Sequence, residues 1–211
     1  FNLQYFDNAM ESTQLIIRDS FKSDTISITS NTILNLPQDE YQLVMTAQGY
    51  LPQIFSFGLD EDKEISTTVY YEQLIYEYNQ LKLNQNNSLF LTEKLESLSS
   101  GDSIIIELKF RYELEWDYDY FKIDYINNSD TIEIIQFTGD NYHFHTEYIP
   151  FKIPEGDNNG KILFYLERDG SIDYRGIEIE NLKIMTGSET LGNPSNEFGL
   201  IPGEFQLYQN H

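Results

Sequence analysis

Four acidic residues have the type and spacing that most directly suggest chemistry. Glu113, Glu115, Asp117 and Asp119 occupy alternate positions, so their side chains would project from one face of an extended segment. Like charges held this close repel one another unless they spread into solvent or a cation neutralises them, and Ca²⁺ prefers oxygen ligands such as carboxylates. Two interpretations therefore stay open: a polar outer face, or a calcium site that these residues form with Glu180.

Aromatic residues make a second candidate site in the same part of the chain. Trp116, Tyr118 and Tyr120 alternate along the sequence, and Tyr142 follows in a later segment. Such rings can form a platform on which sugar rings stack, whereas aromatic residues in a β domain more often pack in the core. Both interpretations stay open, and the candidate ligand-binding residues are Trp116, Tyr118 and Tyr142.

A histidine pair is the third candidate. His143 and His145 alternate on an expected strand, where both rings would face the same side. They would begin a zinc site with Glu147 or Asp140 as a third ligand, or form an exposed aromatic edge without metal. Nucleophile elbows, H-E-x-x-H motifs and P-loops are absent from the sequence. We therefore expect no catalytic residues and no enzymatic activity in this chain.

The composition limits the partners of the protein. The chain of 211 residues has a formal net charge of −22 and no cysteine. Nucleic acid and anionic membranes need a basic surface, so we expect neither nucleic-acid binding nor membrane insertion. No apolar run approaches the ~20 residues that span a bilayer. Such acidity is typical of an exported or calcium-binding protein, and equally of a solvated surface that prevents association.

Short apolar runs separated by Asn, Asp, Ser and Gly indicate an all-β fold with many turns. Runs at 15–17, 26–28 and 33–36 predict three short strands, and 41–46 predicts a strand buried on both faces. Residues 74–98 leave helix, strand and linker open, because part of their apolar pattern also fits a helical stripe. The neighbouring β pattern favours an extended structure or a linker.

A change of phase separates two longer strands. Apolar residues occupy even positions over 104–120 and odd positions over 121–125. A single strand of that length would be unusual. We predict strands at 104–112 and 119–126 with a connection at 113–118.

A second change of phase lies in a later strand. Ile177 and Ile179 alternate with acidic residues, but the next apolar pair is Leu182 and Ile184. A slip of one residue in an alternating strand predicts a β-bulge near Glu180–Asn181. With about seven or eight antiparallel strands, this part of the chain suits a sandwich or a jelly roll.

Two stretches resemble known families of β domains. Residues 34–52 read LNLPQDEYQLVMTAQGYLP and resemble the carboxypeptidase-regulatory-like (prealbumin-like) β-sandwich of exported bacterial proteins. WDYDYFKIDY at 116–125, FTGD at 137–140 and DGSIDYRGIEIENLKI at 169–184 resemble the MAM-like, concanavalin-like jelly roll that follows the catalytic domain in immune-inhibitor-A-type metallopeptidases. The resemblances imply a small scaffold sandwich followed by an accessory jelly roll.

The tail carries a third resemblance. EFQLYQNH at 204–211 follows a Gly- and Pro-containing stretch and is similar to the opening of the C-terminal sorting domain of the type IX secretion pathway. It implies a secreted or cell-surface bacterial protein. The expected domains are 1–10 as an extension or tag remnant, 11–73 as the prealbumin-like sandwich, 74–187 as the jelly roll, and 188–211 as a linker to a missing sorting domain.

These patterns together predict an all-β chain of two antiparallel β-sandwich domains. The resemblances imply a non-catalytic accessory or spacer region of a larger secreted protein, a peptidase, whose upstream catalytic domain would be its partner. The alternative is an adhesion module at the cell surface that binds a polysaccharide or a surface protein. Calcium is the one candidate cofactor in either case.

Overall fold

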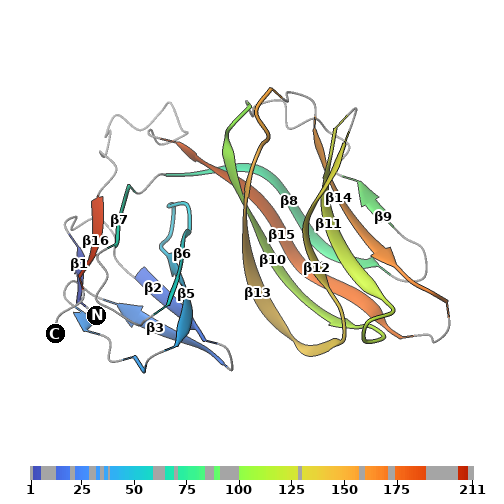
Figure 1. Ribbon diagram of the computed structural model, residues 1–211, viewed down its shortest axis with the longest axis horizontal. Coiled ribbons are helices and arrows are strands. Elements are labelled where there is room, and N and C mark those ends of the chain that lie inside the picture. Colours follow the sequence, from blue (N-terminus) through green and yellow to red (C-terminus); the bar gives the residue numbers. More distant parts are fainter. Residues whose placement is uncertain are drawn as a thin grey trace. The chain divides into compact units, whose positions relative to one another are not determined.

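The computed structural model describes residues 2–5, 13–19, 22–28, 32–33, 36–37, 39–58, 65–68, 71–83, 88–90, 100–127, 130–156, 160–170, 174–188 and 204–208. These ranges contain strands, turns and irregular segments (Figure 1). No helix in them is long and apolar enough to cross a membrane. The chain forms two compact units: unit 1 comprises Phe1–Gln73 and Thr186–His211, and unit 2 comprises Leu74–Met185.

Unit 1 contains two four-stranded antiparallel sheets. One sheet has the order β3 (Ser23–Ile28), β2 (Thr13–Arg18), β5 (Glu40–Thr46) and β6 (Gln53–Gly58). The other has the order β4 (Thr32–Ile33), β1 (Asn2–Tyr5), β16 (Glu204–Tyr208) and β7 (Ile65–Thr68). Successive residues Leu43, Val44 and Met45 are all buried. The prediction that this strand is buried on both faces is confirmed.

The structure differs from the prediction at both ends of the chain. Residues 1–10, set aside as an extension, contain β1, and the predicted linker at 188–211 contains β16. The two strands pair antiparallel, from Asn2 opposite Tyr208 to Tyr5 opposite Phe205. Backbone hydrogen bonds make this pairing, and segments of four and five residues are too short to show a reliable apolar period.

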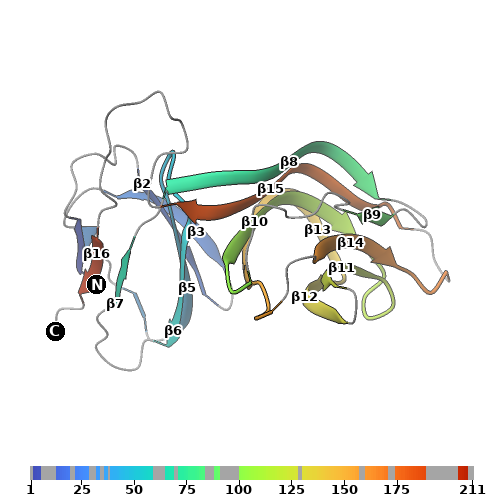
Figure 2. The same cartoon turned by 90° about the horizontal axis from the view of Figure 1, so that it is seen from above.

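Unit 2 contains two further four-stranded sheets (Figures 1 and 2). The first has the order β13 (Asp140–Lys152), β10 (Ser103–Glu113), β15 (Gly176–Ser188) and β8 (Tyr71–Leu83). The second has the order β12 (Thr131–Phe137), β11 (Tyr120–Ile126), β14 (Lys161–Glu167) and β9 (Ser88–Phe90). From β8 to β15 the chain changes sheet at every connection except β11–β12. This connectivity defines a jelly roll, so the predicted fold class is confirmed.

The core of unit 2 lies between its two sheets. In β10 the even positions from Ile104 to Phe110 are completely buried, and in β11 the odd positions Phe121 and Ile123 are too. Residues 114–119 form the connection between these strands. The predicted change of phase, and the two strands that it separates, are therefore confirmed.

The second predicted change of phase is also present. Ile177 and Ile179 in β15 are 2% and 1% exposed, and the next fully buried pair is Leu182 and Ile184. The ambiguous stretch 74–98 is extended where it is described, in β8 and β9. Residues 84–87 and 91–98 lie outside the described part of the chain.

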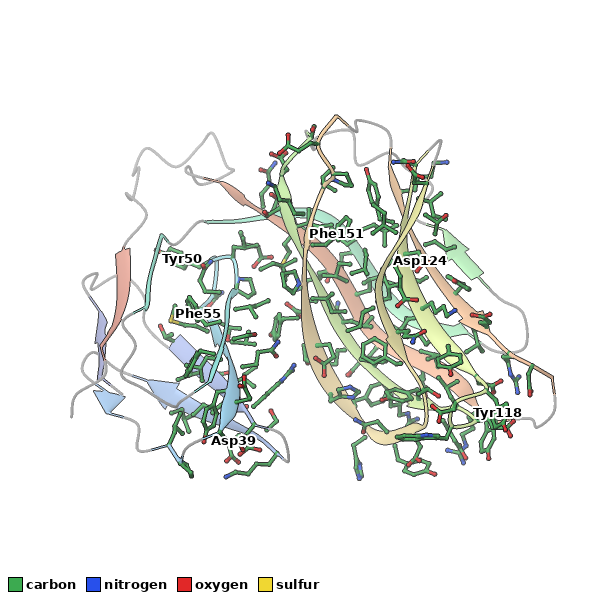
Figure 3. All side chains as sticks on the ribbon, viewed as in Figure 1. Asp39, Tyr50, Phe55, Tyr118, Asp124 and Phe151 are labelled. Atoms are coloured by element: carbon green, nitrogen blue, oxygen red, sulfur yellow. The ribbon has the colours of Figure 1, made fainter. Side chains whose placement is uncertain are left out.

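Asp124, which lies within β11, has a buried carboxylate side chain (Figure 3). Asp124 is 5% exposed, and within the described residues its Oδ1 atom has no hydrogen-bond partner. Tyr165 on the neighbouring strand β14 forms a side-chain hydrogen bond with Asp124. Burial, followed by this hydrogen bond, raises the pKa of Tyr165 to about 12. The phenol proton is therefore held more tightly in the folded chain than in the unfolded chain.

This pair predicts how stability depends on alkaline pH. Because the pKa of Tyr165 is raised on folding, the unfolded chain loses this proton first, and stability falls between about pH 10 and pH 12. Tyr165→Phe should lower the free energy of unfolding by about 1–3 kcal/mol at pH 8, because it removes a partner from a buried carboxylate. The same substitution should also reduce the fall in the free energy of unfolding between about pH 10 and pH 12. Urea titrations at about pH 8, 10 and 11.5 test this. An equal loss of unfolding free energy at high pH in the wild type and in Tyr165→Phe would contradict it.

Candidate ligand-binding site

The jelly-roll connectivity brings three connections to one end of unit 2. They join β10 to β11 (114–119), β12 to β13 (138–139) and β14 to β15 (168–175). The Leu114 amide donates to the Gly139 carbonyl at 2.8 Å, which ties the first connection to the second. Arg168 Nε lies 3.3 Å from Asp119 Oδ2, which ties the first to the third. Figure 3 shows Tyr118 at this end, which we call the aromatic end.

The three predicted aromatic residues are exposed to solvent in this structure. Trp116, Tyr118 and Tyr142 are 68%, 59% and 57% exposed, so they do not belong to the core. Trp116 and Tyr118 lie on the β10–β11 connection, and Tyr142 lies near the start of β13. The interpretation of these three residues as core is therefore wrong, and they are available to a ligand.

A glycine allows the Trp116 ring to lie close to the backbone of the β12–β13 connection. Gly139 has a φ of +76°, and a Cβ atom there would lie 2.5 Å from Cε3 of Trp116. Any side chain at this position would strain the backbone and displace the indole. Asp117 also has a positive φ, of 61°, and its amide donates to Thr138 Oγ1 at 3.0 Å. The β10–β11 connection is thus held by the β12–β13 connection.

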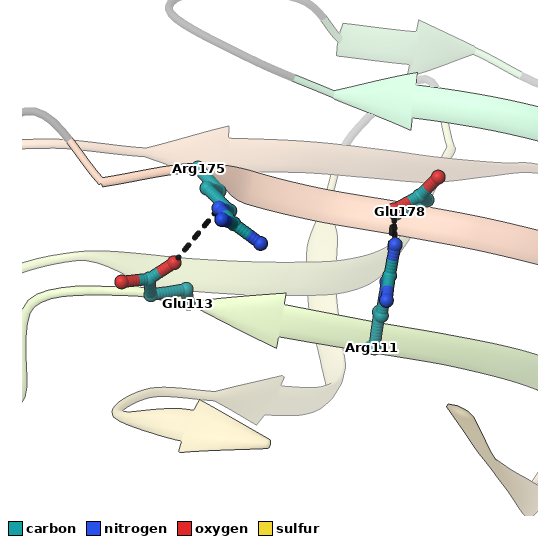
Figure 4. Close-up of polar contacts among 4 residues, drawn as sticks. All are labelled: Arg111, Glu113, Arg175 and Glu178. Carbon is teal, nitrogen blue, oxygen red and sulfur yellow. Dashed lines mark hydrogen bonds and ion pairs between the residues drawn. The ribbon is translucent and has the colours of Figure 1, made fainter. Parts of the chain in front are cut away.

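Charged side chains form a ladder across the outer faces of β10 and β15. Lys109 Nζ lies 2.6 Å from Glu180 Oε2. Next along the strands, Arg111 donates to Glu178 Oε2 from Nε at 2.8 Å and from Nη2 at 2.5 Å. At the end of the ladder Arg175 Nε lies 3.5 Å from Glu113 Oε2 (Figure 4).

An irregularity in β13 lies beside this ladder. Phe110 pairs with His145, but Tyr112 pairs with Asn141, so residues 142–144 stand opposite Arg111 alone. Bulges of this kind change the direction of side chains and are frequent beside functional sites. The centroid of the Phe144 ring lies 4.7 Å from the guanidinium carbon of Arg111. Arg111 is therefore held by a carboxylate and by an aromatic face.

A cleft of about 390 Å³ opens where the ladder and the bulge meet. Its volume lies within the range of small-molecule sites. Asp140 and then burial raise the pKa of Tyr142, and burial, Glu147 and Asp140 raise the pKa of Tyr112, so both phenols stay protonated donors. The residues that line the cleft are Arg111, Tyr112, Glu113, Asn141, Tyr142, Arg175, Gly176, Ile177 and Glu178.

The five predicted calcium ligands do not gather at one point. Glu113 pairs with Arg175, Glu180 with Lys109, and Asp119, which is 1% exposed, with Arg168. Asp117 is exposed in the turn, where Glu115 accepts backbone hydrogen bonds through its carbonyl. Because 114–119 is a turn and not an extended segment, the four acids of the alternate series do not share one face. Within the described ranges, no group of three or more His, Asp or Glu residues is arranged to hold a metal ion.

Calcium binding stays a prediction that a melting experiment tests. If these acids bind calcium, adding calcium to chelator-treated protein raises the melting temperature, because a ligand of the native state stabilises it. The double variant Glu115→Gln and Asp117→Asn should then abolish the rise, whereas Glu133→Gln on β12 should keep it. A melting temperature that does not respond to calcium would rule out the site.

The histidine pair is split by the irregularity in β13. His143 is exposed, whereas His145 packs against Phe110 with the ring centroids 4.5 Å apart. His145 Nε2 lies 3.6 Å from Glu147 Oε1. The two rings therefore occupy different environments: His143 is exposed, whereas the His145 side chain is 26% exposed and packs against the core residue Phe110.

Several residues of the cleft were not predicted from the sequence. Among them are Arg111, Asn141, Arg175 and Glu178, which come from three strands or their ends. The sequence contains part of this information. Arg111 and Glu113 in β10, and Glu178 in β15, occupy the positions that alternate with buried residues, so their side chains are expected on the outer face. Which strand lies beside which is the information that alternation does not contain.

Comparisons with known proteins identify no family. No protein-family model matches the chain, and no curated protein is significantly similar to it. Among solved structures, that of the infectious bursal disease virus Gt strain matches with a TM-score of 0.30 and 13% identity, over 97% of this chain and 58% of that one. The VP2 subviral particle of the same virus matches with a TM-score of 0.26 and 9% identity, over 97% and 61%. This chain therefore spans less than two thirds of each of these proteins. The class that the structure itself defines is an all-β protein of two antiparallel β-sandwich units.

Proposed function

We propose that this chain is a non-catalytic binding module and that unit 2 binds carbohydrate at its aromatic end. The observation that carries the proposal is the exposure of Trp116, Tyr118 and Tyr142, each more than half exposed, on two segments of the same end. Large apolar surfaces that gather on a soluble protein often mark an interaction site.

The chemistry of these rings favours sugars over other ligands. Trp and Tyr present a flat apolar face together with a polar N–H or O–H group, which matches a sugar ring with its C–H face and hydroxyl rim. Trp116 lies close to Gly139, and the turn that carries it is tied to the next connection by the Asp117 amide, which donates to Thr138 Oγ1. A rigid platform loses little conformational entropy when a ligand binds.

Glycan binding by purified variants tests this proposal. The wild-type chain should bind at least one oligosaccharide on a glycan array, and calorimetry should give its affinity. Trp116→Ala or Tyr142→Ala should weaken binding about five- to thirty-fold, because stacking on one ring is worth roughly 1–2 kcal/mol. Circular dichroism should show that the fold is retained.

Ile132→Ala is the matched control. Ile132 is 37% exposed near the start of β12, directly after the β11–β12 turn, which lies at the other end of the jelly roll. Its truncation removes exposed apolar surface away from the aromatic end and should leave the affinity for glycan unchanged. An equal loss of glycan affinity in Ile132→Ala and Trp116→Ala would overturn the proposal. The absence of glycan binding by the wild type would also overturn it.

We also propose that this module serves an accessory role in a larger secreted bacterial protein with a peptidase domain. The resemblances of 34–52, 116–125, 169–184 and 204–211 to parts of exported proteins support this proposal. An immunoblot of source cells and spent medium, with peptide mapping of the band, tests it. A band far above 24.8 kDa with upstream hydrolase peptides is expected. A band at that mass without such peptides would contradict the accessory role.

A further inference from the structure

We infer that the cleft beside Tyr142 is a subsite for neutral saccharides and discriminates against acidic ones, with Arg175, Glu113 and Asn141 contacting ring hydroxyls. This inference rests on the proposed function and names the class of sugar. Tyr142 connects the two, because it is one of the three exposed aromatic residues of the aromatic end and also lines the cleft.

The first step concerns the hydrogen-bonding groups of the cleft. A sugar hydroxyl both donates and accepts, so it is best matched by a donor and an acceptor placed side by side. The cleft offers this combination twice, in Arg175 with Glu113 and in Arg111 with Glu178. Asn141 adds an amide, which also donates and accepts.

The second step distinguishes the two ion pairs. Arg111 makes two short hydrogen bonds to Glu178 and lies against the Phe144 ring, so its position is fixed. Arg175 is 84% exposed and meets Glu113 through one contact of 3.5 Å. Such a loose pair, with Arg175 in solvent and the Glu113 side chain 26% exposed, contributes little to stability. Its donors and acceptors can therefore turn to a ligand at low cost.

The third step is the charge balance. Two arginines and two glutamates line the cleft, so their formal charges cancel, and Asp140 lies close enough to Tyr142 to raise its pKa. The whole chain carries a net charge of −22. A carboxylated or sulfated sugar would gain no net attraction from a cleft whose formal charges cancel, and it would meet the repulsive field of the acidic chain around it. A neutral sugar is not repelled.

The experiment compares neutral with acidic probes on the full chain. The neutral probes are cellohexaose, laminarihexaose and mannohexaose, and the acidic probes are an oligogalacturonide and a sulfated galactan oligomer. The wild type should bind a neutral probe and no acidic one. Arg175→Gln should weaken that binding about ten-fold, since it removes a charge-assisted hydrogen bond. Glu113→Gln should weaken it similarly and raise acidic binding at low salt.

Lys109→Gln is the matched control, since Lys109 belongs to the same ladder but does not line the cleft. It should bind like the wild type. Failure of the two proposals gives different results. One result is binding of a neutral probe that is lost in Trp116→Ala but unchanged in Arg175→Gln; another is a wild type that prefers acidic probes. Either result would overturn the proposal for the cleft and leave the proposal for the aromatic end standing. A wild type that binds none of the probes or array glycans would overturn both.

Discussion

The burial of Phe110 is the constraint on which the organisation of unit 2 depends. Its ring lies 6.0 Å from that of Phe121, 4.9 Å from that of Phe137 and 4.5 Å from that of His145. These contacts join β10 to strands of both sheets, and burial of such aromatic surface is a main source of stability. Because strand side chains alternate, an inward Phe110 requires an outward Arg111. The hydrophobic core therefore sets the positions of the charged ladder.

The candidate site arises where this regularity ends. Beyond Phe110 the pairing with β13 shifts, and beyond Glu113 the chain turns with Asp117 in a left-handed conformation. Such features cost free energy and persist because neighbouring structure holds them. Here the holding contacts are the Asp117–Thr138 hydrogen bond and the packing of Trp116 on Gly139. These two contacts tie the β10–β11 connection, which carries Trp116 and Tyr118, to the β12–β13 connection.

Alternation made the strands of unit 2 predictable, because the phase changes at 113–118 and at Glu180–Asn181 follow directly from burial of every second residue. Partners in the sheet were not predictable in this way. The pairing of β1 with β16 joins residues about 200 positions apart, and the Arg111–Glu178 contact joins residues 67 apart. The close approach of Trp116 to Gly139 is likewise a tertiary contact that a linear pattern does not reveal.

The ion pairs that arginines form in this acidic chain differ in burial: one is buried and structural, and another is exposed at the proposed ligand site. The sequence has four arginines, and three of them, Arg111, Arg168 and Arg175, lie at the aromatic end with a carboxylate partner each. Arg168 and Asp119 are 8% and 1% exposed, so this pair fastens two connections away from solvent. Burial of such a pair carries a large desolvation cost, which its geometry must offset. Arg175 has neither burial nor a short contact, so fold stability does not explain its place at the mouth of the cleft. The proposed saccharide would account for it, because hydroxyls that replace water around Arg175 and Glu113 would strengthen contacts that solvent now weakens.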